Sequence, residues 1–143
     1  MKRLFLPLLA LLVTGCGTLN TAPTAGQLLD APTTLNVAGN PVKADAFPTI
    51  KRDTFNVKVK LSTTKPTLPG LKVTNVYVLT NDGVWIADNT TSKTWKCAAN
   101  CTIAQARGAA NGVQSGAGVQ VILGLQDAQG NQYLLRDAQA QVK

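Results

Sequence analysis

Cysteine, tryptophan and lysine are the residues of this chain whose types and spacing point to chemistry. The sequence contains three Cys, two Trp and fourteen Lys or Arg, while its seven acidic residues are all Asp and it has neither Glu nor His. The lack of His excludes His-based acid–base catalysis, His-containing triads and His metal sites. No Ser has a His or a recognisable Lys partner. We therefore expect a protein that is not an enzyme and that uses no cofactor.

The N-terminus has the order of a secretory signal peptide. Met1-Lys2-Arg3 is cationic, residues 4–13 form an apolar run, and Thr14-Gly15 supplies small residues after it. Ten apolar residues are too few for a transmembrane helix, which needs about 20. The sequence therefore predicts export.

The segment Val13-Thr14-Gly15-Cys16 resembles the lipobox of bacterial lipoproteins. This resemblance implies that residues 1–15 are removed and that Cys16 receives a diacylglyceryl thioether as the new N-terminus. It further implies a membrane-anchored protein of the cell envelope with a periplasmic or extracellular domain. Gly17 stands where enterobacterial lipoproteins carry Asp for inner-membrane retention, so the resemblance favours the outer membrane in an organism that has one.

Cys97 and Cys101 remain once Cys16 is assigned to the lipid. An even pair of Cys in an exported protein is expected to form a disulfide. The C-x-x-x-C spacing also resembles the paired Cys of periplasmic copper chaperones, but those sites add a His, and the only Met of this chain leaves with the signal peptide. We expect a structural disulfide and no metal site, with functional thiols as the alternative.

The mature chain divides into a tether and one domain. Residues 16–32 are rich in Thr, Ala, Pro and Gly and predict a flexible tether, which leaves residues 33–143 as the domain. Residues 54–61 alternate with period two, placing Lys58 and Lys60 on a solvated face. The apolar positions of that strand are Phe55, Val57, Val59 and Leu61.

Further strands are expected at residues 33–38, 71–80, 84–87, 119–125 and 131–142. The sequence also predicts a bulge between Val73 and Val76, a hairpin turn at residues 81–83, and a flexible loop over the Gly-rich residues 104–118. About seven short strands predict an all-β fold, an antiparallel β-sandwich. The strand spacing resembles immunoglobulin-like or fibronectin-III-like modules of bacterial envelope proteins, and a small β-barrel is the alternative.

Basic residues cluster between positions 51 and 72, where a single Asp53 accompanies them. They are Lys51, Arg52, Lys58, Lys60, Lys65 and Lys72. The whole chain has a net charge of +7, and removal of Lys2 and Arg3 with the signal peptide leaves +5. Such a surface suits anionic head groups, lipopolysaccharide or wall polymers, whereas the alternative is that Lys58 and Lys60 only solvate a sheet face. Nucleic acid is not expected as a partner of an exported, anchored protein.

The two Trp residues differ in their surroundings. Trp85 lies between Val84 and Ile86 and is expected in the core, whereas Trp95 lies in a polar segment, residues 88–96, beside the Cys pair. We expect a lipid-anchored, non-enzymatic envelope module that binds or supports a protein or polymer partner. The alternative is a small-ligand or glycan-binding lipoprotein that uses the loop around Trp95. The candidate binding residues are Trp95, Lys58 and Lys60.

Overall fold

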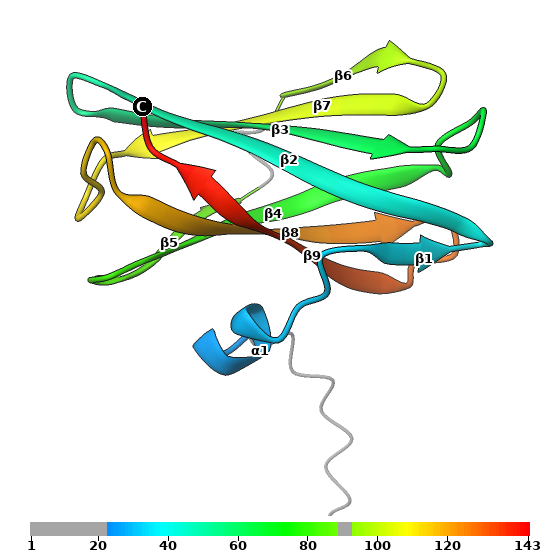
Figure 1. Ribbon diagram of the computed structural model, residues 1–143, viewed down its shortest axis with the longest axis horizontal. Coiled ribbons are helices and arrows are strands. Elements are labelled where there is room, and N and C mark those ends of the chain that lie inside the picture. The colour runs from blue at the N-terminus through cyan, green and yellow to red at the C-terminus, as the bar shows by residue number, and fades with distance from the viewer. Residues whose placement is uncertain (1–22, 89–92) are drawn as a thin grey trace, which may run out of the picture.

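The computed structural model describes residues 23–88 and 93–143, and these form a sandwich of two antiparallel sheets with one short helix (Figure 1). The elements are α1 (Ala25–Leu29), β1 (Leu35–Val37), β2 (Asn40–Lys51), β3 (Thr54–Thr63), β4 (Leu71–Thr80), β5 (Gly83–Asp88), β6 (Lys93–Ala98), β7 (Cys101–Ala109), β8 (Gly118–Asp127) and β9 (Gln132–Gln141). The five-stranded sheet has the order β1-β2-β3-β7-β6, and the four-stranded sheet has the order β5-β4-β8-β9. Cys16 and its lipobox lie outside the described residues.

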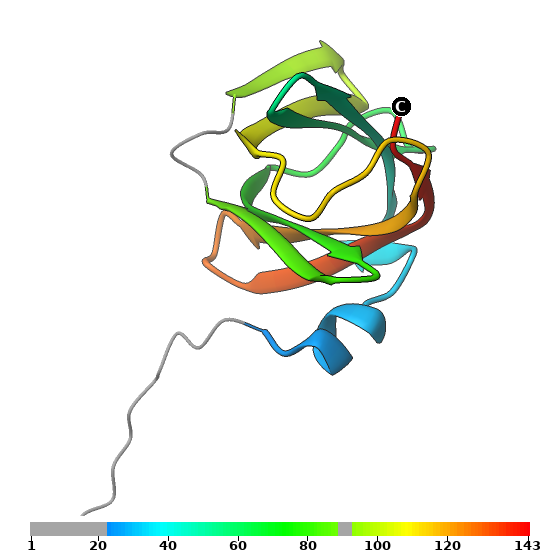
Figure 2. The ribbon, with the colours of Figure 1, turned by 90° about the vertical axis from the view of Figure 1, so that its left-hand side faces the viewer.

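The predicted antiparallel β-sandwich is therefore confirmed, and the two sheets are seen edge-on in Figure 2. Its strand order is also that of an immunoglobulin-like sandwich. In the letters of that fold, β2, β3, β7 and β6 correspond to A, B, E and D, and β5, β4, β8 and β9 correspond to C′, C, F and G. The short β1 precedes this set as a hairpin partner of β2.

Strand β3 has the predicted phase. Its four apolar residues, Phe55, Val57, Val59 and Leu61, are completely buried, and Lys58 and Lys60 are exposed. Trp85 is buried as expected: its ring meets Phe55 edge-on at 4.8 Å, and its Nε1 donates a hydrogen bond to the carbonyl of Ala109 at 2.8 Å. The bulge predicted in β4 is present, because the register with β8 shifts between Val73 and Asn75.

Strand β2 is absent from the sequence predictions, although it alternates strictly between buried and exposed positions. Its inward residues include Ala44, Ala46 and Pro48, which are too small or too unusual in strands to give a clear apolar signal. At one edge of the sandwich β2 meets β9: the Ala46 N–H donates to Asp137 Oδ2 at 2.8 Å, and the Ile50 N–H donates to the carbonyl of Lys143 at 2.9 Å.

The prediction of a loop over residues 104–118 is wrong for its first half. Residues 104–109 belong to β7, which lies between β3 and β6. Ala104 and Ala106 face the core beside Val59 and Val57, and a Cβ on Gly108 would lie 2.8 Å from Cζ2 of Trp85. Small residues are required there by close packing, whereas in the sequence they resemble a loop.

The predicted tether also contains folded structure. Thr24 and Gln27 form a capping box at the start of α1, Leu28 is completely buried, and Arg136 Nε donates a hydrogen bond to the carbonyl of Ala31 at 2.9 Å. Leu28 and Ala31 pack on Tyr77 and Ile122 of the four-stranded sheet. Residues 24–32 are therefore ordered against the sheet, because the capping box, the burial of Leu28 and Ala31 and the hydrogen bond from Arg136 together hold this short helix in place.

Candidate functional site

The outward surface of the five-stranded sheet brings together all three candidate binding residues. We call this surface the basic–aromatic face and define it by Phe47 on β2, Lys58 and Lys60 on β3, Ile103 on β7 and Trp95 on β6. Phe47 is 56% exposed and Trp95 is 39% exposed. Both aromatic rings are therefore accessible to a partner on the same side of the domain.

The strand register fixes how these side chains lie. Lys58 is paired with Phe47 on one side and with Gln105 on the other. Two residues along β3, Lys60 is paired with Asp45 and with Ile103, and Ile103 is paired in turn with Trp95. The two lysines therefore lie between an aromatic residue on β2 and another on β6.

Lys58 and Trp95 are in contact although β7 separates their strands. Lys58 Nζ lies 5.9 Å from the centroid of the Trp95 ring, within the range of a cation–π interaction. One or both side chains must therefore lean across β7 over the sheet. The predictions from sequence named these two residues separately, and the structure brings them together.

The charge on this side of the sheet is mostly positive. Lys43, Lys51, Lys58, Lys60 and Arg107 are exposed at outward positions of β2, β3 or β7, and Asp45 is the exposed carboxylate on the outward side of β2. Lys65 and Lys72, which belong to the same sequence cluster, lie elsewhere, in the β3–β4 connection and on β4. The structure thus divides the basic cluster and places only part of it beside the aromatic residues.

Phe47 is the member of this face that the sequence did not reveal. Its signal was available in the alternation of β2, where Phe47 occupies an outward position between the buried Ala46 and Pro48. Trp95 was expected in a loop, and the structure places it on β6, the edge strand of the sheet. The Trp95 side chain therefore extends from a regular strand and not from a loop.

A disulfide joins Cys97 and Cys101 beside Trp95, as predicted, with their Cα atoms 5.4 Å apart. It closes the turn between β6 and β7, where the register shifts between Lys96 and Ala98. Within residues 23–88 and 93–143 there is no cluster of three or more Cys or Asp side chains that could hold a metal ion. The disulfide thus fastens the edge strand that carries Trp95 to the inner strand β7.

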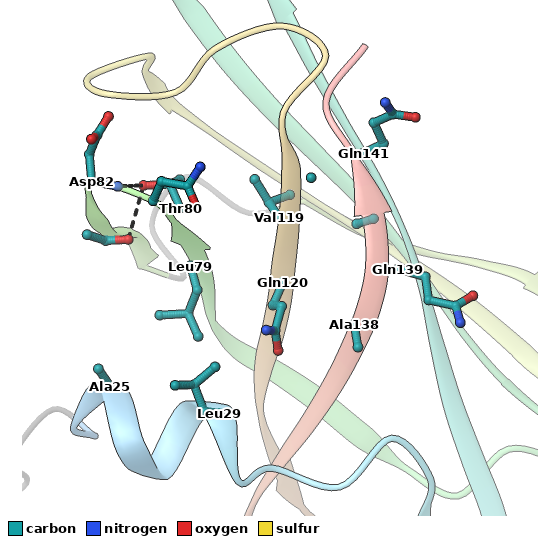
Figure 3. A pocket seen from close by; sticks show the side chains of 14 residues that line it. Ala25, Leu29, Leu79, Thr80, Asp82, Val119, Gln120, Ala138, Gln139 and Gln141 are labelled. Carbon is teal, nitrogen blue, oxygen red and sulfur yellow. Dashed lines mark hydrogen bonds between the residues drawn. The ribbon is translucent and has the colours of Figure 1, made fainter.

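The opposite outer surface, that of the four-stranded sheet, has two grooves, one on each side of α1. The first, of about 820 Å³, lies between Leu29 of α1 and the ends of β4, β8 and β9, with Thr80, Asp82 and Gln120 in its lining (Figure 3). The Thr80 hydroxyl accepts from the Asp82 N–H at 3.2 Å and donates to the Gly83 carbonyl at 3.1 Å, so this polar group is engaged within its own turn. The second groove, of about 780 Å³, includes Pro23, Tyr77 and Tyr133.

Among the described residues, the ionisable groups with a shifted pKa lie in the four-stranded sheet. Each shift comes from burial or from hydrogen bonds within a turn. Burial raises the pKa of Tyr77, which lies beneath α1. At the β8–β9 turn, desolvation acts to raise the pKa of Asp127, but hydrogen bonds from Asn131, Tyr133 and the Gln129 N–H outweigh it and lower the pKa. The hydrogen bond to Asp127 in turn raises the pKa of Tyr133. Asp127, Asn131 and Tyr133 thus form a local hydrogen-bond network within the β8–β9 turn.

Comparison of the chain with protein-family models, with curated proteins and with solved structures finds no match. In the described residues, no helix has both the length and the apolar character to cross a membrane. The site's function must therefore be argued from its own residues.

Proposed function

We propose that this protein is a lipid-anchored, non-enzymatic module of the cell envelope that presents the basic–aromatic face to a protein or polymer partner. The observation that carries the proposal is the exposure of Phe47 and Trp95 beside Lys58 and Lys60 on one sheet surface. The N-terminal signal and the lipobox resemblance at residues 13–16 support the anchor.

The position of α1 supports an orientation for this module. Pro23 and α1 lie against the four-stranded sheet, on the side of the sandwich away from β6 and β7 (Figures 1 and 2). Six residues, 17–22, lie between Cys16 and Pro23, and the seven residue steps from Cys16 to Pro23 span at most about 25 Å. A lipid on Cys16 would therefore hold the α1 side toward the membrane and turn the basic–aromatic face away from it.

The anchor is tested by the intact mass of the protein extracted from membranes. A mature chain that begins at Cys16 and carries acyl chains supports it, and Cys16→Ser should leave an uncleaved precursor. A mature chain that begins elsewhere and stays soluble without detergent contradicts it.

The binding role is tested by photo-crosslinking in intact cells. A photoreactive residue in place of Lys60 should capture a partner protein or polymer, and one in place of Lys72 on β4 serves as the matched control because it is also an exposed strand lysine. Equal capture from both positions, or none from Lys60, would refute the proposal for this face.

A further inference from the structure

We propose that the partner of the basic–aromatic face is an anionic polysaccharide. Its sugar rings would lie against Trp95 and Phe47, and its carboxylate or phosphate groups would contact Lys58 and Lys60. This inference rests on the proposed function, because it names the chemical class of the partner of the same face.

The basic–aromatic face combines two chemistries on one surface, since it presents both amines and aromatic rings. A polyanion without rings needs only the amines, and a neutral glycan needs only aromatic surfaces for the C–H faces of its sugars. Lys58 lies directly between Phe47 on β2 and the side chains of β7, and its Nζ lies 5.9 Å from the Trp95 ring. An acidic group on a sugar that contacts Trp95 is therefore within reach of Lys58.

The shape of the face favours a polymer over a small molecule. β2 and β6 are separated by three inter-strand spacings, which amounts to about 14 Å. Neither of the two grooves on the α1 side includes Trp95 or Lys58 in its lining. Because the face is formed by side chains on neighbouring strands, a ligand can gain affinity there from contacts spread over the sheet surface, which suits an extended chain better than a small molecule that needs an enclosed pocket.

The order of charges along β3 fits a repeating anion. Lys58 and Lys60 point to the same side of the sheet and are two residues apart, which corresponds to about 7 Å along the strand. Asp45 lies opposite Lys60 and supplies an acceptor for hydroxyl groups. Asp45 repels any polyanion, but the many hydroxyl groups of a sugar can donate hydrogen bonds to its carboxylate and so offset that repulsion.

The anchoring membrane is a poorer candidate for the same chemistry. Its head groups are also anionic, but an anchor at Cys16 places the α1 side toward the membrane, and the basic–aromatic face lies on the other side of the sandwich. A protein with an acidic surface is a different class of partner and is one outcome of the test.

The test uses the full lipidated chain, anchored in neutral phosphatidylcholine vesicles, and measures its affinity for four probes added from outside at low and at high ionic strength. The probes are polygalacturonate as the charged glycan, dextran as the neutral glycan, polyaspartate as the ring-free polyanion, and phosphatidylglycerol vesicles as the membrane. The variants are Trp95→Ala and the pair Lys58→Gln with Lys60→Gln. Matched controls on the other sheet are Ile86→Ala, an exposed apolar strand residue, and Lys72→Gln.

We expect polygalacturonate to bind in a salt-sensitive manner and both face variants to weaken it about five- to tenfold. The controls should change the affinity less than about twofold, and dextran and polyaspartate should bind more weakly than polygalacturonate. Polyaspartate binding of equal strength, or an unchanged affinity of Trp95→Ala, would overturn the glycan assignment, and so would stronger binding to the vesicles. If polygalacturonate does not bind while the crosslinker at position 60 still captures a protein, the glycan is wrong and the proposed function stands. If neither occurs, both are wrong.

Discussion

The two outer surfaces of this sandwich differ in how their apolar side chains are covered. The four-stranded sheet has apolar side chains on its outer side, including Tyr77 and Ile122, and α1 covers them with Leu28. The five-stranded sheet places lysines and arginine between its outward aromatic residues, and in the described part of the chain Phe47 and Trp95 remain exposed. α1 thus covers only part of the first surface, where Val84 and Ile86 on β5 stay exposed, whereas on the second surface the exposed aromatic side chains lie among basic residues.

This difference shows what the fold requires and what it leaves free. Stability of a sandwich comes from the inner faces, where residues of both sheets form one continuous core. The outer faces need only be solvated or covered. Folding does not require exposed aromatic side chains to lie among lysines, and this combination is the reason to propose binding on the five-stranded side.

The largest expected effect is the difference in stability between a substitution on the buried side of β3 and one on its exposed side. Val57→Asp places a carboxylate in a position with no solvent exposure and should lower the free energy of unfolding by about 3–5 kcal/mol. Lys58→Asp on the exposed side should cost less than about 1 kcal/mol, including the loss of its interaction with Trp95. Urea denaturation of both variants provides the measurement. Similar losses in the two variants would show that the inner and outer faces of β3 are misassigned.

A smaller effect is expected where α1 covers the four-stranded sheet. Leu28→Ala removes a completely buried side chain and should cost about 2–4 kcal/mol, whereas Leu29→Ala, at an exposed neighbouring position, should cost less than about 0.5 kcal/mol. Amide exchange at Arg136 reports the same event, because its N–H donates to the carbonyl of Pro32 at 2.9 Å. Exchange that is as slow in Leu28→Ala as in the unmodified chain would mean that α1 does not hold this segment in place.

The contrast between the two faces was only partly predictable from the sequence. The inner phase of β3 could be predicted because Phe55, Val57, Val59 and Leu61 are large and apolar and alternate with polar residues. Strands β2 and β7 were missed because Ala44, Ala46, Ala104 and Ala106 fill inward positions with small side chains. Period two is present in both strands, but alanine gives little hydropathy contrast with its neighbours.

The candidate site shows the same limitation. Trp95, Lys58 and Lys60 could be named from their types, but their proximity depends on β7 lying between β3 and β6, which is a matter of topology. Phe47 was overlooked because its strand was overlooked. The covering of the other face by α1 was also hidden, since Leu28 and Leu29 are only a short apolar pair in a segment otherwise typical of a linker.

A substitution at the edge where β2 meets β9 should lower the free energy of unfolding less than the substitutions of Val57 and Leu28. Asp137→Ala leaves the Ala46 N–H without the carboxylate that accepts its hydrogen bond and should cost about 1–2 kcal/mol. Asp137→Asn retains an acceptor oxygen and should recover a good part of that loss. Thermal unfolding of the two variants tests this step. A loss in Asp137→Asn as large as that in Asp137→Ala would show that the negative charge, and not the hydrogen bond, matters at this edge.

The smallest expected effect is a pH dependence of stability that arises at Asp127, in the four-stranded sheet. Hydrogen bonds from Asn131, Tyr133 and Gln129 hold the pKa of Asp127 below its ordinary value, so this carboxylate stabilises the fold above its unfolded pKa of about 3.9. The contribution is lost as the pH falls through the lower, folded pKa. Asp127→Asn should therefore be less stable than the unmodified chain near neutral pH, and the difference should shrink below about pH 4. Tyr133→Phe removes one donor to the carboxylate and should show part of the same change. Urea midpoints measured across this range decide the matter, and a difference that stays constant down to about pH 2 would show that the charge on Asp127 does not stabilise the turn.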